Sequence, residues 1–512
     1  MVVGIIHYHS NTGGVTTVIR SILDGMSSGN NNVTFLFAAG GKAPVWFEKY
    51  KFHKCTYLRI RELGYLPHSI RKTESCEIYQ SLKKKLYYFS SQCDLIHAHN
   101  ISVGKNPLIS LVLQELAAEG KPIVYHCHDF AEDMRALNQR LQKKIICQFF
   151  KKKLSDILYP QCENVSYVCI NERARQFMIK AGAEPRRVYH AANPVYADLT
   201  VAGLKKNQKR LNSIRKSIFR ECGLPACGRI FTYPSRAIRR KNIGEFILMA
   251  NLFPADSWLI TRAPSLSSGI EISPERKNYN SWAEFCKKNV PNIILEAGSK
   301  WELSLLYAAS DGVISVSTSE GFGYALIEPW LYDLPVYARI PRGLFSELAQ
   351  FPYTKWLYQR LDIPASLFVN TRKNKITSIV DFADLSAAMQ KKIILLCKKN
   401  ITISEKFREK LQFIPAGQGR GEERIRAQSE HVNKNISKII NKNADYVKTR
   451  YSLKVFTDTM IKIYSAVYSG AGKKTAFKKN KSLDLYSLVK SFFCADNMCL
   501  NKNRKETEFS KL

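Results

Sequence analysis

Short apolar runs alternate along this chain with segments in which apolar residues recur every three or four positions. The runs are typical of buried strands, and the recurring segments, of which Thr16–Met26 is the clearest, are typical of amphipathic helices. In the first 200 residues the predicted strands are Val2–His9, Val33–Ala39, Leu95–Ala98, Ile123–Cys127 and Val165–Ile170. Strands that are apolar throughout are covered on both faces, so we expect a parallel sheet with helices on each side.

The same alternation restarts after a basic segment, Leu204–Glu221. The second set of predicted strands is Arg229–Tyr233, Trp258–Thr261, Asn292–Leu295, Gly312–Val316 and Pro335–Ala338. Helices are expected from Asn242, over Trp301–Ala309, and from about Leu326, because Pro329 fits only in a first helical turn. We therefore expect two doubly wound, Rossmann-like α/β domains that face each other across a cleft, with ligands at the carboxyl ends of the strands.

The strand pattern fades after about residue 371, where Asp381–Asn400 and Asp445–Tyr468 are predicted helices. The segment from Ser469 onward is rich in lysine, and we expect it to be largely flexible, with a short helix at Leu483–Phe493. The expected organisation is an N-terminal domain at 1–200, a basic linker at 201–228, a C-terminal domain at 229–444, a terminal helix at 445–468 and a basic tail at 469–512.

Charge adds a preference for anionic partners. The chain carries 78 Lys and Arg against 43 Asp and Glu, a formal net charge of +35, which attracts the phosphates of a nucleotide, a nucleic acid or an anionic lipid. Because no recognised nucleic-acid module is visible, we expect no specific nucleic-acid partner, and a non-catalytic polyanion-binding protein remains as an alternative.

The apolar runs and the cysteines of the chain indicate its cellular compartment. No run approaches the 18 apolar residues of a membrane span, and the first residues are typical of a strand rather than a signal peptide. The 13 cysteines include no Cys-x-x-Cys pair, which favours free thiols in a reducing compartment. We expect a cytoplasmic protein.

One predicted helix, Gln139–Ile157, is both basic and amphipathic. The simpler interpretation places its apolar face in the protein core. The alternative is a helix that lies on an anionic membrane, which would make the protein peripheral at the inner face of the membrane.

Two glycine-containing turns follow strands. Gly13 and Gly14 open the first helix and allow a backbone to approach a ligand, although a plain tight turn explains them equally well. The segment Ser317–Gly323 joins a strand to a helix, and Glu320 and Glu328 lie eight positions apart around it. Taken singly, these glutamates are explained by the helix dipole and by a solvated helix face.

A pair of cations follows the strand Arg229–Tyr233. Arg236 and Lys241 lie on the loop that follows this strand, opposite the glycine turn, where they could hold a diphosphate without metal. The alternative is a basic surface loop. The sequence contains no Asp-x-Asp, so we expect no metal ion at this site.

Together these residues resemble a retaining glycosyltransferase of family 4, whose fold is GT-B. The matching segments are Gly13–Val15, Asp94–His99, His126–Asp129, Asn193–Val195, Ser235-Arg236 with Lys241-Asn242, and Glu320–Gly323 with Glu328. The two glutamates match the E-x7-E motif of that family, and the helix at 445–468 resembles its terminal helix, which packs back on the first domain.

The resemblance implies a nucleotide-sugar donor, UDP- or GDP-linked, which is a substrate, so no cofactor is expected. By this resemblance Arg236 and Lys241 would bind the diphosphate, and the turn residues Gly321, Phe322 and Gly323 would contact phosphate or sugar through their backbone. Glu328 would accept hydrogen bonds from the ribose hydroxyls. Glu320 and His128 would contact the donor sugar, and Gly14 would approach the phosphate or the acceptor. The family retains anomeric configuration, and a front-face attack would need no protein nucleophile. His97, His99 and His126 are interpreted as plain strand-end histidines.

Three departures from the family pattern occur at Asn242, at Thr261–Pro264 and at Pro329. The second lies where the family often has a glycine-rich turn beside the base, so the base stays open between uracil and guanine. The acceptor, a sugar, a lipid-linked molecule or a small molecule, is set by loops that match no known pattern. A sugar-nucleotide epimerase of similar fold is a further alternative, and it would need no acceptor.

Overall fold

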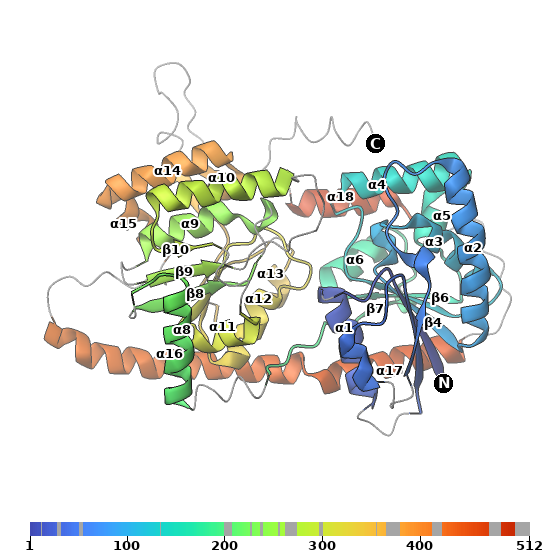
Figure 1. Cartoon of the computed structure of the whole chain (residues 1–512), viewed down its shortest axis with the longest axis horizontal. Coiled ribbons are helices and arrows are strands. Elements are labelled where there is room, and N and C mark those ends of the chain that lie inside the picture. Colours follow the sequence, from blue (N-terminus) through green and yellow to red (C-terminus); the bar gives the residue numbers. More distant parts are fainter. Residues whose placement is uncertain are drawn as a thin grey trace, which may run out of the picture. The chain divides into compact units, whose positions relative to one another are not determined.

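The structure is a computed structural model of the whole chain. It describes residues 1–11, 13–27, 32–50, 55–133, 135–198, 207–225, 228–235, 239–253, 257–261, 274–295, 301–341, 343–354, 356–364, 379–411, 422–470 and 483–496. The chain forms two compact units, the first from Met1–Pro194 together with Tyr451–Leu512, and the second from Val195–Arg450 (Figure 1).

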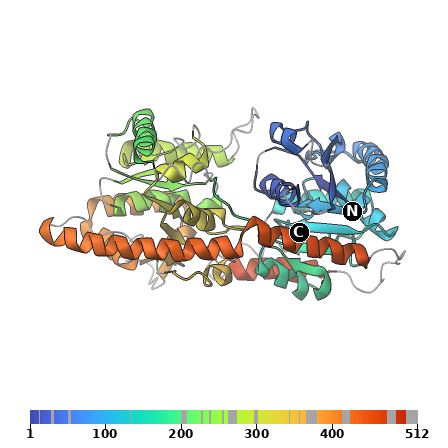
Figure 2. The ribbon, with the colours of Figure 1, turned by 90° about the horizontal axis from the view of Figure 1, so that it is seen from below.

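Unit 1 is built on a seven-stranded parallel sheet in the order β3-β2-β1-β4-β5-β6-β7. The strands are β1 Val2–His7, β2 Thr34–Ala39, β3 Cys55–Arg59, β4 Leu95–His99, β5 Ile123–Cys127, β6 Val165–Cys169 and β7 Val188–His190. The helices are α1 Gly14–Ser27, α2 Lys72–Ser91, α3 Pro107–Ala118, α4 Ala136–Gln142, α5 Leu154–Leu158, α6 Glu172–Lys180, α17 Leu453–Ser469 and α18 Leu485–Asp496. Helices cover both faces of the sheet (Figures 1 and 2).

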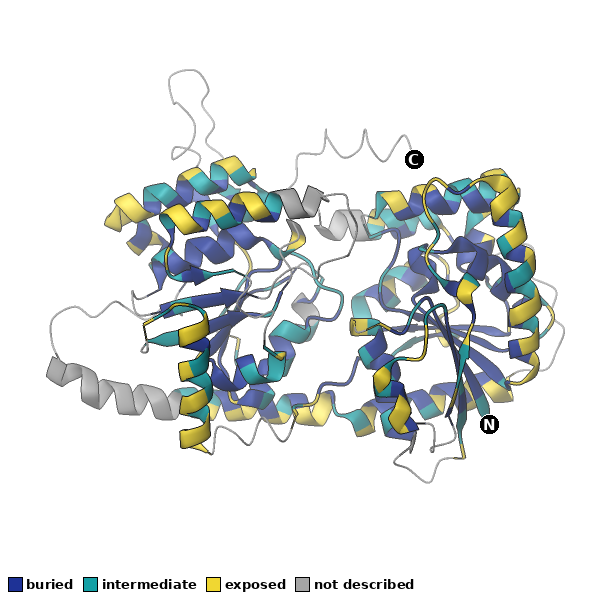
Figure 3. Ribbon diagram, in the orientation of Figure 1, coloured by how far each residue is buried: buried dark blue, intermediate teal, exposed yellow. Residues whose placement is uncertain are grey.

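Alternate side chains of each strand fill two separate cores, one on each face of this sheet. In β4, Ile96 packs with the helices α2 and α3, whereas its neighbour Leu95 packs with α1 and α17. The central strands β4, β5 and β6 are buried along their whole length, while the outer faces of the helices are exposed (Figure 3). Two-sided burial explains why these strands are apolar without alternation.

Unit 2 has a six-stranded parallel sheet in the order β10-β9-β8-β11-β12-β13. Its strands are β8 Arg229–Tyr233, β9 Ser257–Thr261, β10 Ile293–Ile294, β11 Gly312–Ser315, β12 Val336–Arg339 and β13 Leu357–Tyr358, and β14 Asp362–Pro364 pairs antiparallel with β15 Ile379–Asp381. The helices are α8 Gln208–Glu221, α9 Ile243–Leu252, α10 Pro274–Asn289, α11 Leu303–Ala309, α12 Tyr324–Ile327, α13 Phe345–Leu348, α14 Ala387–Lys399, α15 Ile401–Lys410 and α16 Glu422–Arg450.

The segment expected to be a linker, 201–228, contains α8, which belongs to unit 2. Ile218 and Phe219 of α8 are buried against Leu306 of α11 and Ile230 of β8. The segment was predicted to be a linker because it is rich in basic residues, and its apolar stripe spans only the last turns of the helix. Residues 201–206 and 226–227 of the expected linker lie outside the described residues.

The C-terminal part also differs from expectation. The helix expected over 445–468 is two helices, because α16 ends at Arg450 and α17 begins at Leu453, where Ser452 caps it by accepting a hydrogen bond from the Val455 amide. α17 packs on α1 in unit 1. The short helix expected at Leu483–Phe493 in the basic tail, 469–512, is present as α18, but it packs on α6 in unit 1 and buries Leu488 fully, so this part of the tail belongs to the packed unit.

The basic amphipathic segment Gln139–Ile157 has its apolar face in the core of unit 1, where Ile145 and Ile146 are fully buried. It is not one α-helix. α4 passes into a π-helix, Lys143–Phe149, and the chain turns at Lys151, whose φ is 55°, before α5. In the part of the chain that the structure describes, no helix combines the length and apolar composition needed to cross a membrane.

Candidate active site

The carboxyl ends of β8 and β11 lie side by side in unit 2. The chain moves from β8 outward to β9 on one side, and β11 lies on the other side of β8. Ligands of doubly wound sheets bind at such a switch point, because loops that leave neighbouring strands in opposite directions open a crevice there. The loop after β8 carries Arg240 and Lys241, and the loop after β11 carries Glu320.

The side chains of these two loops form a charge cluster. The ammonium of Lys241 is hydrogen-bonded to Oε1 of Glu320. Nη1 of Arg240 lies 3.4 Å from Oε2 of Glu320 and donates to the carbonyl of Ser319 at 2.8 Å. The side chains of Lys241 and Glu320 are 15% and 10% exposed, so the pair is mostly shielded yet reachable from one side. Such a cluster presents two cations and one carboxylate to a ligand.

Backbone contacts hold the two loops together. The Thr318 amide donates to the carbonyl of Arg240 at 2.8 Å, and the Thr318 hydroxyl donates to the same oxygen at 3.1 Å. On the other side, the buried Tyr233 hydroxyl donates to the carbonyl of Lys241 at 2.6 Å. The cations are therefore attached to a fixed backbone although they lie on a loop.

Asn242 completes the turn with a left-handed backbone, at φ 51° and ψ 48°. Asparagine tolerates this conformation better than most residues, which explains why it can stand where the glycosyltransferase pattern has glycine. Its side-chain amide donates to Glu245 at 2.7 Å, and the amide of Gln390 donates to its oxygen at 3.5 Å.

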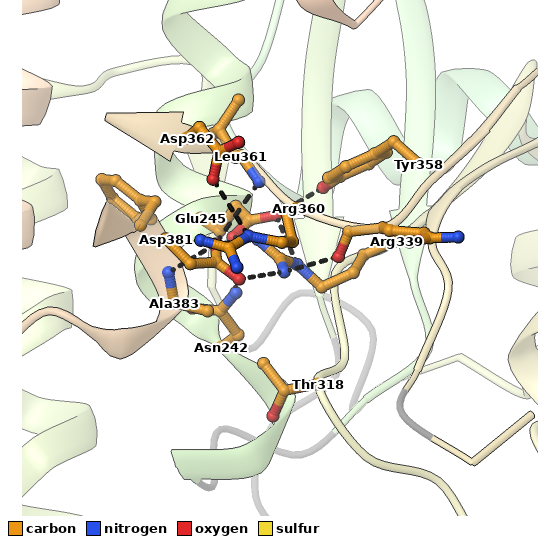
Figure 4. Close-up of polar contacts among 12 residues, drawn as sticks. Asn242, Glu245, Thr318, Arg339, Tyr358, Arg360, Leu361, Asp362, Asp381 and Ala383 are labelled. Atoms are coloured by element: carbon orange, nitrogen blue, oxygen red, sulfur yellow. Dashed lines mark hydrogen bonds and ion pairs between the residues drawn. The ribbon is translucent and has the colours of Figure 1, made fainter. Parts of the chain in front are cut away.

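Behind Asn242 lies a buried ionic network (Figure 4). The guanidinium of Arg339 donates to both oxygens of Glu245, at 3.0 and 2.7 Å, and to both oxygens of Asp381, at 2.8 and 2.7 Å. The Tyr358 hydroxyl donates to Glu245 at 2.5 Å. All three charged side chains are at most 3% exposed. Burial favours the neutral carboxyl, but the hydrogen bonds and charge of Arg339 outweigh it and lower the pKa of Asp381.

The glycine turn after β11 is tightly packed. Gly323 has φ 86°, and a Cβ there would lie 2.7 Å from Leu344, so a larger residue would strain the backbone and displace that side chain. Phe322 is buried against Tyr324, with ring centroids 4.8 Å apart. The helix that follows, α12, begins at Tyr324 rather than near Leu326. It changes to a 3₁₀ turn at Glu328, because Pro329 has no amide to continue α-helical bonding.

Glu328 lies in this 3₁₀ turn, where burial raises the pKa of its carboxyl to about 7, an effect that a hydrogen bond with Tyr307 partly opposes. The expected solvated helix face is therefore wrong for this residue. At neutral pH its carboxyl is balanced between an acceptor and a donor form.

The carboxyl edge of the first sheet carries the remaining predicted residues. Gly14 is exposed at the start of α1, and a Cβ there would meet open space, so packing does not require glycine. His128 follows β5, is 7% exposed, and has its pKa lowered to about 4 by burial. Next to it, Asn100 and Asp129 exchange hydrogen bonds of 2.8 and 3.2 Å, and Arg135 is bonded to Asp129.

Solved structures of similar fold cover nearly the whole chain. The Anabaena protein HepE, solved in complex with UDP-glucose, is 13% identical with a TM-score of 0.53, and the match covers 91% of this chain and 100% of that one. Sucrose-phosphate synthase from Thermosynechococcus elongatus is 12% identical with a TM-score of 0.53, and the match covers 91% of this chain and 99% of that one. The chain has the GT-B fold.

Among curated proteins, the mannosylglucosyl-3-phosphoglycerate synthase of Petrotoga mobilis is 27% identical to this GT-B chain over 339 residues. The match covers 63% of this chain and 62% of that relative's length. No protein-family model matches the sequence.

The site residues predicted from the sequence divide into three groups on this GT-B chain. Lys241, Glu320, Gly321, Phe322, Gly323 and Glu328 lie on the adjoining loops of unit 2, and Gly14 and His128 lie at the sheet edge of unit 1. Arg236 lies outside the described residues, as do Arg262, Ala263 and Pro264 next to Thr261.

Two groups are not found by the sequence analysis. One is the Arg339 network, which unites α9, β12 and β15 and has no local pattern. The other is the stack of histidines under α17. For the stack a signal is present: His97 and His99 alternate on β4, His126 and His128 alternate around the end of β5, and alternation places all four on one sheet face.

Proposed function

We propose that this protein is a retaining, metal-independent glycosyltransferase that moves a hexose from a nucleotide-sugar donor to an acceptor hydroxyl. The observation that carries the proposal is the Lys241–Glu320 pair at the β8–β11 switch point, beside the glycine turn at Gly321–Gly323. The UDP-glucose complex of HepE and the name of the Petrotoga relative support a sugar-nucleotide donor and a sugar product.

The chemistry follows from the charges. Cleavage of the anomeric C–O bond builds negative charge on the leaving diphosphate, and fixed cations lower the energy of that state. We assign this role to Lys241 and Arg236. Glu320 forms an ion pair with Lys241. A diphosphate would draw the ammonium away, and the carboxylate of Glu320 would then accept hydrogen bonds from the hexose.

Retention needs no protein nucleophile in this scheme. The acceptor attacks from the side on which the diphosphate leaves, and an oxygen of the diphosphate takes the acceptor's proton. Glu328 accepts hydrogen bonds from the ribose, backbone amides of Gly321–Gly323 contact phosphate or sugar, and Gly14 and His128 contribute from unit 1. The acceptor is a hydroxyl of a sugar, a lipid-linked molecule or a small molecule.

A thermal-shift panel of UDP- and GDP-hexoses tests the proposal. A true donor at 100 times its Kd stabilises the folded protein by about 2.7 kcal/mol. Hexoses linked to one of the two nucleotides, UDP or GDP, should therefore raise the melting temperature, and hexoses linked to the other should not. Product analysis with donor alone distinguishes the alternatives. If the protein converts the donor to an epimerised sugar nucleotide without an acceptor, its reaction is epimerisation and not transfer. If no sugar nucleotide shifts the melting temperature, the proposal is wrong.

A further inference from the structure

Three histidines meet on one face of the first sheet, in unit 1, whereas the predicted diphosphate-binding residues belong to unit 2. His97 and His99 alternate on β4, and His126 on β5 is the register partner of His99. All three are at most 1% exposed. Each offers one ring nitrogen to a group in which the nitrogens lie within 4.8 Å of one another.

The three imidazoles are held in the neutral form that binds metals. All three rings are buried, and burial away from water disfavours the charged imidazolium. Each ring therefore carries one N–H and one free lone pair at neutral pH.

Outer hydrogen bonds fix which nitrogen faces inward. Nδ1 of His97 lies 2.7 Å from the hydroxyl of Tyr464 on α17, and Nδ1 of His99 lies 3.1 Å from Nε2 of His128. If both Nδ1 atoms carry the proton and donate it, both Nε2 atoms are left as bare lone pairs. A second hydrogen bond that sets the tautomer in this way is the usual environment of a metal-binding histidine.

Two ring nitrogens of the group have no hydrogen-bond partner in the described part of the protein. Among the described residues, Nε2 of His99 and Nε2 of His126 are buried and have no hydrogen-bond partner. Buried polar atoms without a partner are rare, and a bound ion or an ordered water is a common reason for them. Nε2 of His99 is such an atom within the three-histidine group, and a bound ion would satisfy it.

The distance between a ring nitrogen of His97 and a ring nitrogen of His126 also suits a metal ion. Nε2 of His97 and Nδ1 of His126 lie 3.2 Å apart. Two nitrogens bound at about 2.0–2.1 Å to a tetrahedral zinc ion lie roughly 3.3 Å apart. The ligand atom of His126 in this arrangement is Nδ1, the nitrogen that faces His97.

We propose that His97, His99 and His126 bind one divalent transition-metal ion of the zinc and cobalt class. The ion joins β4 to β5 and, through His97 and Tyr464, fixes α17 on the sheet. Its role is structural, and it takes no part in binding the donor diphosphate, so the proposed transfer reaction stands or falls independently. The rival is a purely hydrogen-bonded stack of neutral imidazoles with a trapped water.

The first experiment measures metal content, because a buried site is loaded most readily during folding. Full-length protein is produced with added zinc, dialysed against a weak chelator, and analysed by elemental mass spectrometry. We expect about one zinc per chain. Protein produced with cobalt should show the visible absorption bands of a tetrahedral nitrogen site.

Variants locate the ion. H126T keeps a β-branched residue suited to a strand, and H99Q keeps a polar side chain of similar reach; each should lose most of the bound metal and the cobalt bands. H68N is the matched control, because His68 is exposed and lies outside the group. It should keep both. Circular dichroism confirms that each variant is folded.

The metal content of the wild-type protein is sufficient to overturn the proposal. The test therefore remains decisive even if a variant misfolds. Less than about a tenth of an equivalent of zinc and no cobalt bands would establish the hydrogen-bonded stack instead. Full metal content in folded H126T and H99Q would place the ion elsewhere and would equally remove the proposed site. Donor binding, measured by thermal shift with UDP-glucose, tests the transfer proposal separately.

Discussion

The ammonium of Lys241 is bonded to the carboxylate of Glu320, 79 positions further along the chain. The sheet order explains the contact, since β8 and β11 are neighbours and their loops leave the same edge. A candidate phosphate-binding cation is thus already paired with the residue proposed to contact the sugar. Ligand binding must exchange this partner for another, and that exchange can be measured.

The first prediction concerns the cation. Lys241→Ala should weaken UDP-sugar binding by about 1.5–3 kcal/mol, the worth of a charged hydrogen bond, or roughly one to two decades in Kd. Arg236→Ala should act in the same direction. Calorimetric titration with the donor found in the thermal-shift panel measures both. Lys216→Ala, on α8, is the control, and unchanged affinity in the Lys241 variant would remove the diphosphate clamp.

The two glutamates should separate kinetically. Glu320→Gln should lower kcat with little change in melting temperature, because the sugar contact strengthens in the transition state. Glu328→Gln should mainly raise the donor KM, because a ribose contact stabilises ground and transition states alike. Steady-state kinetics at varied donor concentration decide this, and the opposite pattern would exchange their roles.

Glu328 also predicts a pH dependence. Its carboxyl, with a pKa raised to about 7 by burial, accepts ribose hydrogen bonds fully only above that pH. If only the ionised form binds, the Kd for the donor should tighten roughly tenfold between about pH 6 and 8. The same raised pKa adds stability that is complete below about pH 4.5 and lost as the pH rises through about 7.

Titrations with UDP-glucose rather than UDP avoid the ionisation of a terminal phosphate. Glu328→Gln should flatten the pH profile. A slope that persists in this variant would assign the effect to another group.

The Arg339 network should control the stability of unit 2. Arg339→Met leaves two buried carboxylates without a neutralising cation, and a loss of about 3–5 kcal/mol is expected from breaking a buried pair. Arg360→Met is the matched control, because its bond to Asp362 at 3.0 Å is about two-fifths exposed on both sides and should contribute less than about 1 kcal/mol. Chemical denaturation of both variants is the measurement, and equal losses would contradict the network's role.

Truncation should separate α17 from α18. A chain that ends at Arg450 loses Phe456, Met460, Ile463 and Tyr464 from the core of unit 1. Each buried side chain of this size contributes about 1.5–3 kcal/mol, so the loss approaches the whole stability of a domain and unit 1 should not fold.

A chain that ends at Ser469 loses only α18, with Leu483 and Leu488, from the described part of unit 1. It should fold with a melting temperature lower by several degrees and should keep donor binding. Insolubility of this longer chain would show that α18 is essential to unit 1.

Much of the fold follows from local pattern. β5 and β8 have the bounds that their apolar runs predict, and β1, β4 and β11 differ from prediction by only one or two residues. The reason is physical: a strand buried on both faces must be apolar throughout, and this requirement is visible in any short window. The contact between Lys241 and Glu320 was not predicted, because it depends on the order of strands in the sheet, which places β8 beside β11.

The rest depends on contacts between distant residues. The sequence pattern predicts a helix from Asp381, yet this residue ends β15, because its carboxylate is bonded to Arg339, 42 positions away. The break between α16 and α17 at Ser452 is hidden in the sequence, because both helices have continuous amphipathic patterns. The pKa of Glu328 likewise depends on burial around Pro329, which the residue's own neighbours in sequence do not reveal.

Unit 1 is discontinuous, since the chain leaves it at Pro194 and returns at Tyr451. A ribosome therefore finishes every strand of the first sheet long before it makes the helix that seals one face. At about 5–20 residues per second, the interval is on the order of tens of seconds. Throughout it Val3, Ile5, Leu95 and Val124 lack their cover from α17. The nascent protein therefore carries an open apolar face while the second unit is being made, and such a face favours aggregation until α17 is available.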